Sequence, residues 1–354
     1  MSKFFSTKYS SLIPYTPGEQ PKNMEYVKLN TNESPYKPSE NVYEAVKKEA
    51  EKLHLYSDPQ STIITEKIAK RYGVSPDMVL VTNGSDEVLN FAFMAYGDQE
   101  KEMLFPEITY GFYTVFADLN GVKYRQVPLK DDFSIDTSDY IAKNTTIIIA
   151  NPNAPTGIAL SRDQIEEIVK SNPNNVVVID EAYVDFGAES CVDLVHKYDN
   201  LLVTMTFSKS RSMAGARIGF GIGSKAIIND LNTIKYSTNP YNVNRISQVA
   251  GACAIDDDKY YMDNCKKIIE TRNYTKNGLE KMGFEVLNSS ANFLFAKSDK
   301  IGGEELYLKL KENGVLVRHF KAEKIKDYNR ITIGTKEQMD IFLNKTKEIL
   351  EAVK

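Results

Sequence analysis

The sequence predicts an α/β fold, with a large domain whose mostly parallel sheet is sandwiched by helices and a smaller α+β domain. Three observations support this prediction. Between residues 75 and 223, short apolar runs alternate with amphipathic stretches, which is typical of a parallel sheet covered by helices. Several runs are continuous in β-branched residues, as in strands buried on both faces. After residue 255 a long charged helical stretch is followed by short strand-like runs.

The elements are expected in the following order. The first 30 residues, rich in proline, predict an extended arm. Strands are then expected at Met78–Thr82, Lys123–Leu129, Thr146–Ala150, Val176–Asp180, Leu201–Phe207 and Ile218–Ile222. Residues Ser161–Lys170 begin with an N-cap serine and repeat apolar residues at helical spacing. In the smaller domain we expect a helix over Asp256–Met282, strands at Phe293–Ala296, Val315–Arg318 and Arg330–Ile333, and a final helix.

This layout predicts three regions: residues 1–35 as an arm that contributes to the small domain, 36–250 as the large domain and 251–354 as the small domain. The formal net charge of −4 argues against general nucleic-acid binding, which needs a basic face. The three cysteines and three histidines lack disulfide or metal-ligand spacing, so no metal is expected and a reducing compartment fits. No stretch resembles a signal peptide or membrane span, and we expect a cytoplasmic protein with small-molecule partners.

Polar residues follow several of the predicted strands. Asp180 ends one strand and Tyr183 follows it, and Ser208 and Lys209 follow the next strand. Ligands of open α/β sheets bind where the carboxyl ends of the strands converge, so these side chains are expected at one site. The other residues expected there are Asn151–Gly157, Asn83–Glu87 and Arg217.

This combination suits pyridoxal 5′-phosphate. A lysine amine can condense with its aldehyde, and a carboxylate can keep its pyridine nitrogen protonated so that the ring accepts electrons. The helix N-terminus at Gly84, Ser85 and Asp86, together with Arg217, suits the phosphate. Each feature alone also has an ordinary structural explanation as a cap, turn or solvated loop, and it is their order along the chain that favours a cofactor site.

The motifs that carry a resemblance are Asp180-Glu-Ala-Tyr183, Thr206-Phe-Ser-Lys209, Ala214-Gly-Ala-Arg-Ile-Gly219 and Asn151-Pro-Asn-Ala-Pro-Thr-Gly157. With them the chain resembles the pyridoxal-phosphate aminotransferases of fold type I. More narrowly, Leu29–Pro35, Tyr56-Ser-Asp-Pro59, Val317-Arg318 and Arg330–Thr335 are similar to the histidinol-phosphate aminotransferase family of histidine biosynthesis.

The resemblance implies a role for each matching residue. Lys209 would bind the cofactor covalently and shuttle the proton, Asp180 would face the pyridine nitrogen, and Tyr183 would face the ring's phenolic oxygen. Tyr110 would stack on the ring. The remaining cofactor contacts would come from Gly84, Ser85, Asp86, Asn151, Thr206, Ser208 and Arg217.

Substrate recognition is expected from Arg330 and Arg318, with Tyr15 and Asn32 as weaker candidates. Arginine can bind a carboxylate or a phosphate through two parallel hydrogen bonds, so one site could accept glutamate or 2-oxoglutarate and a phosphorylated substrate in turn. Tyr56 would reach the cofactor phosphate of a neighbouring subunit, which implies a homodimer with shared sites.

The chain departs from the family pattern at Ala154, where the family usually has an asparagine bonded to the ring oxygen. Tyr183 is then the main donor to that oxygen, unless Asn151 or Asn153 replaces the missing amide. Ser212 stands where the family more often has glycine, and Arg211 adds a cation near the lysine.

Four alternatives are weighed at this point, and two of them are disfavoured. Threonine-phosphate decarboxylase shares the cofactor frame, and a broader aromatic or aspartate-type aminotransferase would keep the reaction but change the substrate. A nucleotide-binding protein is disfavoured, because the glycines of Gly219–Gly223 lie within a predicted strand rather than in a strand-to-helix turn. A cofactor-binding regulator without catalysis is disfavoured by the presence of both Lys209 and Asp180.

Overall fold

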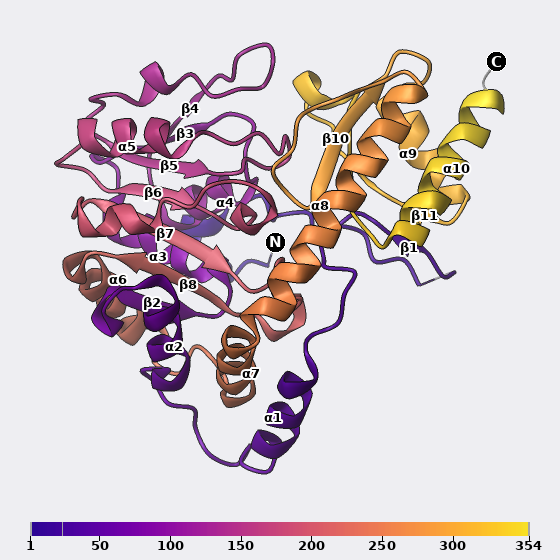
Figure 1. The fold of residues 1–354 in the computed structure, drawn as a ribbon. Helices are drawn as coiled ribbons and strands as arrows, with labels where there is room; N and C mark the ends of the chain where they lie inside the picture. The colour runs from indigo at the N-terminus through magenta and orange to yellow at the C-terminus, as the bar shows by residue number, and fades with distance from the viewer. Residues whose placement is uncertain (1, 23, 353–354) are drawn as a thin grey trace.

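A computed structural model gives the structure of the protein and describes residues 2–22 and 24–352. A seven-stranded sheet and a four-stranded sheet form two parts, and the long helix α8 (Asp258–Lys281) extends between them (Figure 1). The expected α/β fold, with a large mostly parallel sheet between helices and a smaller α+β part, is confirmed. None of the helices in the described ranges is long and apolar enough to cross a membrane.

The strands of the large sheet run in the order β2-β8-β7-β6-β5-β3-β4. All pairs are parallel except those of β8, which is antiparallel to both of its neighbours. The strands are β2 (Val79–Thr82), β3 (Met103–Pro106), β4 (Tyr124–Val127), β5 (Thr146–Ala150), β6 (Val177–Asp180), β7 (Leu201–Thr206) and β8 (Gly219–Gly223). The sequence pattern predicts all of them except β3, which is short, ends in proline and lacks β-branched residues.

Both faces of this sheet are covered by helices. Helices α3 (Ser85–Tyr96), α4 (Phe112–Asn120) and α6 (Lys225–Thr238) pack on one face, and α2 (Thr62–Tyr72), α5 (Arg162–Ser171) and α7 (Arg245–Asp256) pack on the other. Side chains alternate along a strand, so Val177 and Ile179 join the core under α5, whereas Val178 and Asp180 point to the α4 side. Helix α1 (Glu40–Ala50) packs against α7.

The helix predicted to begin at Ser161 is α5, and Ser161 caps its N-terminus as expected. The Ser161 hydroxyl accepts a hydrogen bond from the backbone of Gln164, and the Gln164 side chain accepts one from the backbone of Ser161. This reciprocal capping box satisfies two donors that the helix itself cannot satisfy.

The smaller sheet is antiparallel, in the order β12-β13-β10-β9, and packs against α8, α9 (Gly303–Glu312) and α10 (Lys336–Ala352). Its strands are β9 (Phe284–Val286), β10 (Phe293–Ser298), β12 (Arg318–His319) and β13 (Asn329–Thr332). In the arm, β1 (Val27–Lys28) pairs with β11 (Val315–Leu316), while the ring of Tyr15 packs on Phe112 of α4 with centroids 4.4 Å apart. The arm therefore contacts both parts, and the residue boundaries of the domains stay a prediction.

Candidate active site

A cavity of about 250 Å³ lies at the carboxyl ends of β5, β6 and β7. These strands are parallel, so the residues that follow them meet at the same edge of the sheet. The lining includes most of the residues expected at a cofactor: Ser85, Asp86, Tyr110, Asp180, Tyr183, Thr206, Ser208, Lys209 and Arg217.

Lys209 and Asp180 both line this cavity. The Lys209 Nζ donates a hydrogen bond to the Thr31 carbonyl at 3.3 Å and lies 5.8 Å from the centroid of the Tyr183 ring. Burial raises the pKa of Asp180 to about 6, although a hydrogen bond from Tyr113 and the charge of Lys209 act in the opposite direction. An amine and a buried carboxylate thus face the same small space.

One end of the cavity is built to hold an anion. Helix α3 begins there without a side-chain cap among the described residues, so the N–H groups of Ser85 and Asp86 can bind a ligand. Gly84 has a φ of +84°, and a Cβ at this position would lie 2.5 Å from a guanidinium nitrogen of Arg217. Arg217 can therefore lie over the helix N-terminus, where it pairs with Asp86 at 3.2 Å.

Two hydroxyls and a tyrosine complete this end. The Thr206 and Ser208 hydroxyls are 3.0 Å apart, and the Tyr110 hydroxyl donates to Asp86 at 2.8 Å. The carboxylate of Asp86 is occupied by Tyr110 and Arg217, so Asp86 can serve an anion only through its backbone N–H. A phosphate with an aromatic ring beyond it matches this set of donors, and the residues fit pyridoxal 5′-phosphate.

Tyr183 is held in place by Asn32. The Asn32 amide donates to the Tyr183 hydroxyl at 2.9 Å, and the Asn32 oxygen accepts from Thr332 at 2.9 Å. Because the tyrosine oxygen accepts this bond, its own O–H stays available to donate into the cavity. Asn32 also lines the neighbouring cavity, so it contacts the candidate substrate space as well as Tyr183.

The structure does not bring Asn151 to the cofactor cavity. Both ends of its buried side-chain amide are bonded to the backbone of Leu160, at 2.7 and 3.2 Å. Asn153 is held elsewhere too, since its amide nitrogen donates to the Ile108 carbonyl and the Thr156 hydroxyl. Neither asparagine replaces the amide that is missing at Ala154, which lines the cavity itself.

A second cavity, of about 440 Å³, adjoins the first and shares Tyr110, Tyr183 and Lys209 with it. All four residues expected to recognise the substrate line this cavity: Tyr15, Asn32, Arg318 and Arg330. These four residues come from the arm and the small sheet, whereas Tyr110 and Lys209 belong to the large part. The cavity therefore lies between the two parts of the molecule.

Arg318 and Arg330 lie directly opposite each other on β12 and β13. Like charges at such a cross-strand position are destabilising unless an anion offsets them. Arg318 donates to the arm carbonyls of Thr16 and Pro17, and Arg330 donates to the Asn30 carbonyl, but neither has a carboxylate partner within the described residues. The Arg330 Nε is buried and has no hydrogen-bond partner among the described residues. The pair is therefore suited to an acidic ligand.

Tyr56 lies apart from these cavities. Its side chain is 80% exposed, with the ring stacked on Tyr241 at 4.7 Å. The surrounding loop is fixed through its backbone, because Arg245 donates to the Tyr56 carbonyl, Gln248 to that of Asp58 and Lys235 to that of Pro59. The loop thus presents Tyr56 outward in a defined position.

Residues 24–345 match the aminotransferase class I and II family. The chain belongs to this family. A histidinol-phosphate aminotransferase of Brachyspira hyodysenteriae is 50% identical over 353 residues, which cover 99% of this chain and 100% of the relative. One from Clostridium botulinum (strain Kyoto / Type A2) is 47% identical over 351 residues, or 99% of both chains.

Solved structures support the same fold. The histidinol-phosphate aminotransferase of Sinorhizobium meliloti, solved in complex with pyridoxal-5′-phosphate, matches with a TM-score of 0.92 at 21% identity, over 100% of this chain and 99% of that one. The enzyme from Clostridium acetobutylicum matches with a TM-score of 0.85 at 23% identity, over 92% and 99% of the two chains. At these identities the likeness shows the fold alone.

The aminotransferase contains site residues that the sequence pattern does not single out. Tyr113 donates to Asp180 from the first turn of α4, and Thr31 and Glu33 of the arm line the cofactor cavity. The signal for Tyr113 in the sequence is a tyrosine at helical spacing with the apolar residues Phe116 and Ala117 of α4. Thr31 and Glu33 lie within the motif Leu29–Pro35, but spacing alone could not separate them from Asn32.

Two departures from the family pattern have structural explanations. Ser212 has a φ of +55°, the left-handed conformation that glycine adopts more easily, and its hydroxyl donates to Ser34 at 2.9 Å. Arg211 is buried and pairs with Asp258 at 2.6 Å, while it also donates to the Ala254 carbonyl. Its charge is therefore offset by an acid of α8.

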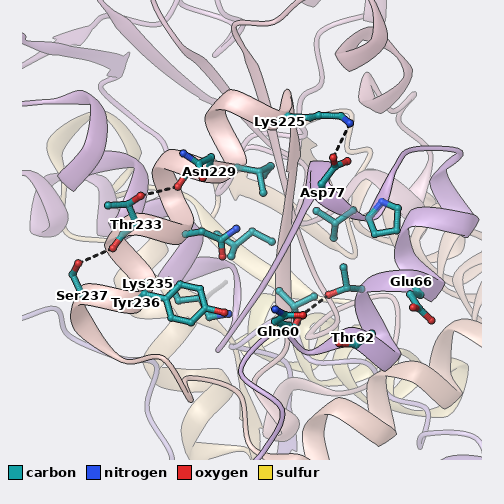
Figure 2. A pocket seen from close by; sticks show the side chains of 17 residues that line it. Gln60, Thr62, Glu66, Asp77, Lys225, Asn229, Thr233, Lys235, Tyr236 and Ser237 are labelled. Carbon is teal, nitrogen blue, oxygen red and sulfur yellow. Dashed lines mark hydrogen bonds and ion pairs between the residues drawn. The ribbon is translucent and has the colours of Figure 1, made fainter.

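A larger cavity of about 950 Å³ lies elsewhere in the aminotransferase, between α2, the edge strand β2 and α6 (Figure 2). At its rim Lys225 pairs with Asp77 at 2.7 Å, and Lys235 is engaged with the Pro59 carbonyl. None of the residues expected at the active site lines this cavity. Size alone therefore does not identify the catalytic centre.

The buried acid Glu181 should make the unfolding free energy of the protein depend on pH. It is fully buried beside Asp180, and burial raises its pKa to about 7, although Ser190 and Cys191 donate hydrogen bonds to it. An acid whose folded-state pKa is raised contributes stability below its unfolded pKa near 4.5, and this contribution is lost as the pH rises towards 7. As the pH rises from 4.5 to 7, the unfolding free energy of wild type should therefore fall by about 2–3 kcal/mol relative to that of Glu181→Gln.

Urea unfolding of both proteins at pH 5 and pH 8 would measure this difference. Glu166→Gln is the matched control, because Glu166 is a partly exposed acid whose pKa is lowered, chiefly by its hydrogen bond with Lys197. A difference between wild type and Glu181→Gln that stays constant with pH would contradict the prediction.

Proposed function

We propose that this aminotransferase uses pyridoxal 5′-phosphate to transfer the amino group of L-histidinol phosphate to 2-oxoglutarate, which gives imidazole acetol phosphate and glutamate. The relatives at 50% and 47% identity support this substrate. The observation that carries the proposal is the pair Arg318 and Arg330, which have no acid partner among the described residues and share a cavity with Lys209. Such a pair suits the phosphate of one substrate and the carboxylate of the other.

The cofactor is held by residues of the first cavity. The phosphate would be bound by the N-terminus of α3 at Gly84, Ser85 and Asp86, with Thr206, Ser208 and Arg217, and Tyr110 would lie against the ring. The Tyr183 hydroxyl would donate a hydrogen bond to the ring oxygen, since Asn32 already occupies its acceptor side. Asn151 is not included in this set, because Leu160 engages its amide.

Bound pyridoxal phosphate supplies an aldehyde that takes up the amine and a ring that withdraws electrons from the substrate Cα. Lys209 would hold that aldehyde between turnovers, and once the substrate amine has displaced it, its free Nζ would take the proton from Cα as a general base. Asp180 would lie near the ring nitrogen and stabilise its protonated form through the negative charge of the carboxylate. The Thr31 carbonyl, which accepts from the Lys209 Nζ, keeps that amine directed into the cavity.

The substrate phosphate binds Arg330 and Arg318, and the carboxylate of glutamate or 2-oxoglutarate uses the same cations in the other half-reaction. Arg330 is confined between the rings of Phe293 and Phe320, at 5.5 and 5.7 Å, so its guanidinium has few alternative positions. Tyr15 of the arm closes the cavity on the side opposite the small sheet. One cationic site thereby serves two acidic groups.

The test is an assay of amino donors with 2-oxoglutarate. Histidinol phosphate should be the best donor, and Arg330→Ala should lower its kcat/KM by about one to two orders of magnitude, because a charge-assisted hydrogen bond contributes about 1.5–3 kcal/mol. Histidinol, which lacks the phosphate, should be affected far less. Arg125→Ala, at an exposed position of β4, is the matched control. Equal losses for histidinol and histidinol phosphate would contradict the proposal.

The same assay separates the alternatives. Release of CO₂ from threonine phosphate without a 2-oxo acid would identify a decarboxylase. Preferred turnover of phenylalanine or aspartate would identify a broader aminotransferase.

We further propose a homodimer in which Tyr56 reaches the cofactor phosphate of the neighbouring copy. The exposed ring, the three anchored carbonyls of its loop and the exposed Leu53 and Leu55 beside it support this assembly. The cytoplasm is the proposed location, since the free thiols of Cys191, Cys253 and Cys265 fit a reducing compartment.

A further inference from the structure

We propose that Tyr113 is a positioning residue of this enzyme, which holds the Asp180 carboxylate in the ionised, oriented form that keeps the cofactor's ring nitrogen protonated. The inference rests on the proposed function, because Asp180 acts on the ring only when the cofactor is bound. It assigns a role to a residue that is not among those lining the cofactor cavity or the substrate cavity.

The fold brings the two side chains together. Asp180 is the last residue of β6, and alternation along that strand directs it to the side covered by α4. Tyr113 lies in the first turn of α4 and is fully buried. Its hydroxyl donates to the Asp180 Oδ2 at 3.0 Å, and the backbone N–H of Ala182 donates to Oδ1 at 3.2 Å. Each carboxylate oxygen thus has one fixed donor.

Aromatic packing fixes the Tyr113 ring. Phe105 and Tyr110 meet it edge-on, each with its centroid 5.7 Å away, and Phe93 lies 6.5 Å away. A phenol held on three sides loses little conformational entropy when it forms its hydrogen bond. The contact is therefore a permanent part of the site rather than one of several rotamers.

The hydrogen bond from Tyr113 affects the pKa of Asp180. Burial and the nearby Asp86 raise the pKa of Asp180, whereas Tyr113, Ala182 and Lys209 lower it. Burial and the same acids raise the pKa of Tyr113 well above 10, so it remains a protonated donor at every working pH. Without the Tyr113 hydroxyl, Asp180 becomes a stronger base and draws the shared proton from the ring nitrogen towards its own oxygen.

The experiment compares Tyr113→Phe with Tyr140→Phe in the holoenzyme. Tyr140 is also fully buried, but its hydroxyl has no hydrogen-bond partner among the described residues, so its loss controls for removing a buried hydroxyl. The primary readout is the ¹⁵N NMR resonance of ring-labelled pyridoxal phosphate across a pH series. We expect Tyr113→Phe to shift this resonance towards the neutral pyridine, and Tyr140→Phe to leave it as in wild type.

Kinetics provide a second readout. Tyr113→Phe should lower kcat by about 10- to 100-fold, as expected for loss of a hydrogen bond to a charged group, with KM nearly unchanged. In an Asp180→Asn background the same substitution should cost little more, since the group it positions is already altered. If Tyr113→Phe does not fold, 3-fluorotyrosine at position 113 keeps the ring and strengthens the donor, and the resonance should then shift towards the protonated form.

An unchanged resonance in the variant used would overturn the inference, as would additive losses with Asp180→Asn. These outcomes differ from a failure of the proposed function. In that case the wild-type chain itself would not bind pyridoxal phosphate, or would bind it without amino transfer from any donor.

Discussion

Replacing Lys209 with alanine should abolish amino transfer, with a loss of at least about 10⁴-fold in kcat. The Lys209 amine is the only lysine nitrogen that lines the cofactor cavity among the described residues, and it is assigned both the covalent bond to the cofactor and the proton transfer at the substrate Cα. The Asp180 carboxylate is poorly placed to replace it, because its oxygens accept hydrogen bonds from Tyr113 and Ala182. Single-turnover kinetics with histidinol phosphate would measure the loss.

Lys225→Ala is the control for this substitution. Lys225 is an exposed lysine of the same part of the molecule, paired with Asp77 outside the active site (Figure 2). Borohydride reduction should trap the cofactor in wild type and in Lys225→Ala, but not in Lys209→Ala. Trapping at another lysine, with turnover retained, would contradict the assignment.

The Lys209→Ala chain also tests whether sites are shared. Mixed with a Tyr56→Ala chain, it should form heterodimers in which one site has an intact Lys209 and receives an intact Tyr56 from the other copy. Random exchange should then restore about a quarter of the wild-type sites. No recovery, with heterodimers demonstrated by mass spectrometry, would contradict the shared site.

Much of the fold could be predicted from the sequence because its strands are buried on both faces. The predicted strand Thr146–Ala150 contains four consecutive β-branched residues, and the observed strand β5 has the same bounds. The strand β3 could not be predicted in this way, since Met103–Pro106 contains no β-branched residue and its pairing depends on neighbours distant in sequence. The antiparallel direction of β8 could not be predicted either, because an apolar run of residues does not indicate the direction of its strand.

The candidate site shows the same limit. Asp180 and Lys209 could be predicted because each follows a recognisable strand, and topology alone brings parallel strand ends together. Asn151 also follows a strand, but its side-chain amide forms hydrogen bonds with the backbone of Leu160. The spacing of residues in the sequence cannot predict such a local contact. Tyr113 was missed for the opposite reason: its partner is 67 residues away in sequence, and only packing of α4 on the sheet joins them.

Replacing Asp180 with alanine is the second substitution with a large expected effect. The carboxylate is buried, and with the cofactor bound it would pair with the protonated ring nitrogen. We expect its loss to lower kcat by about 10²–10⁴-fold, which corresponds to about 3–5 kcal/mol of transition-state stabilisation. Because the missing group is a charge facing the ring nitrogen, the loss should fall on kcat rather than on KM. Steady-state kinetics with histidinol phosphate would separate the two.

A cofactor analogue can distinguish loss of charge from loss of packing. In N-methylpyridoxal phosphate the ring nitrogen is permanently cationic, so it needs no carboxylate to hold a proton. Asp180→Ala loaded with this analogue should recover part of the lost kcat, and the space left by the side chain can accept the methyl group. Wild type should lose activity with the same analogue, since its carboxylate and the fixed Tyr113 hydroxyl leave no room there. If Asp180→Ala were not rescued, Asp180 would act through packing rather than charge, because only a charge can be supplied by the cofactor itself.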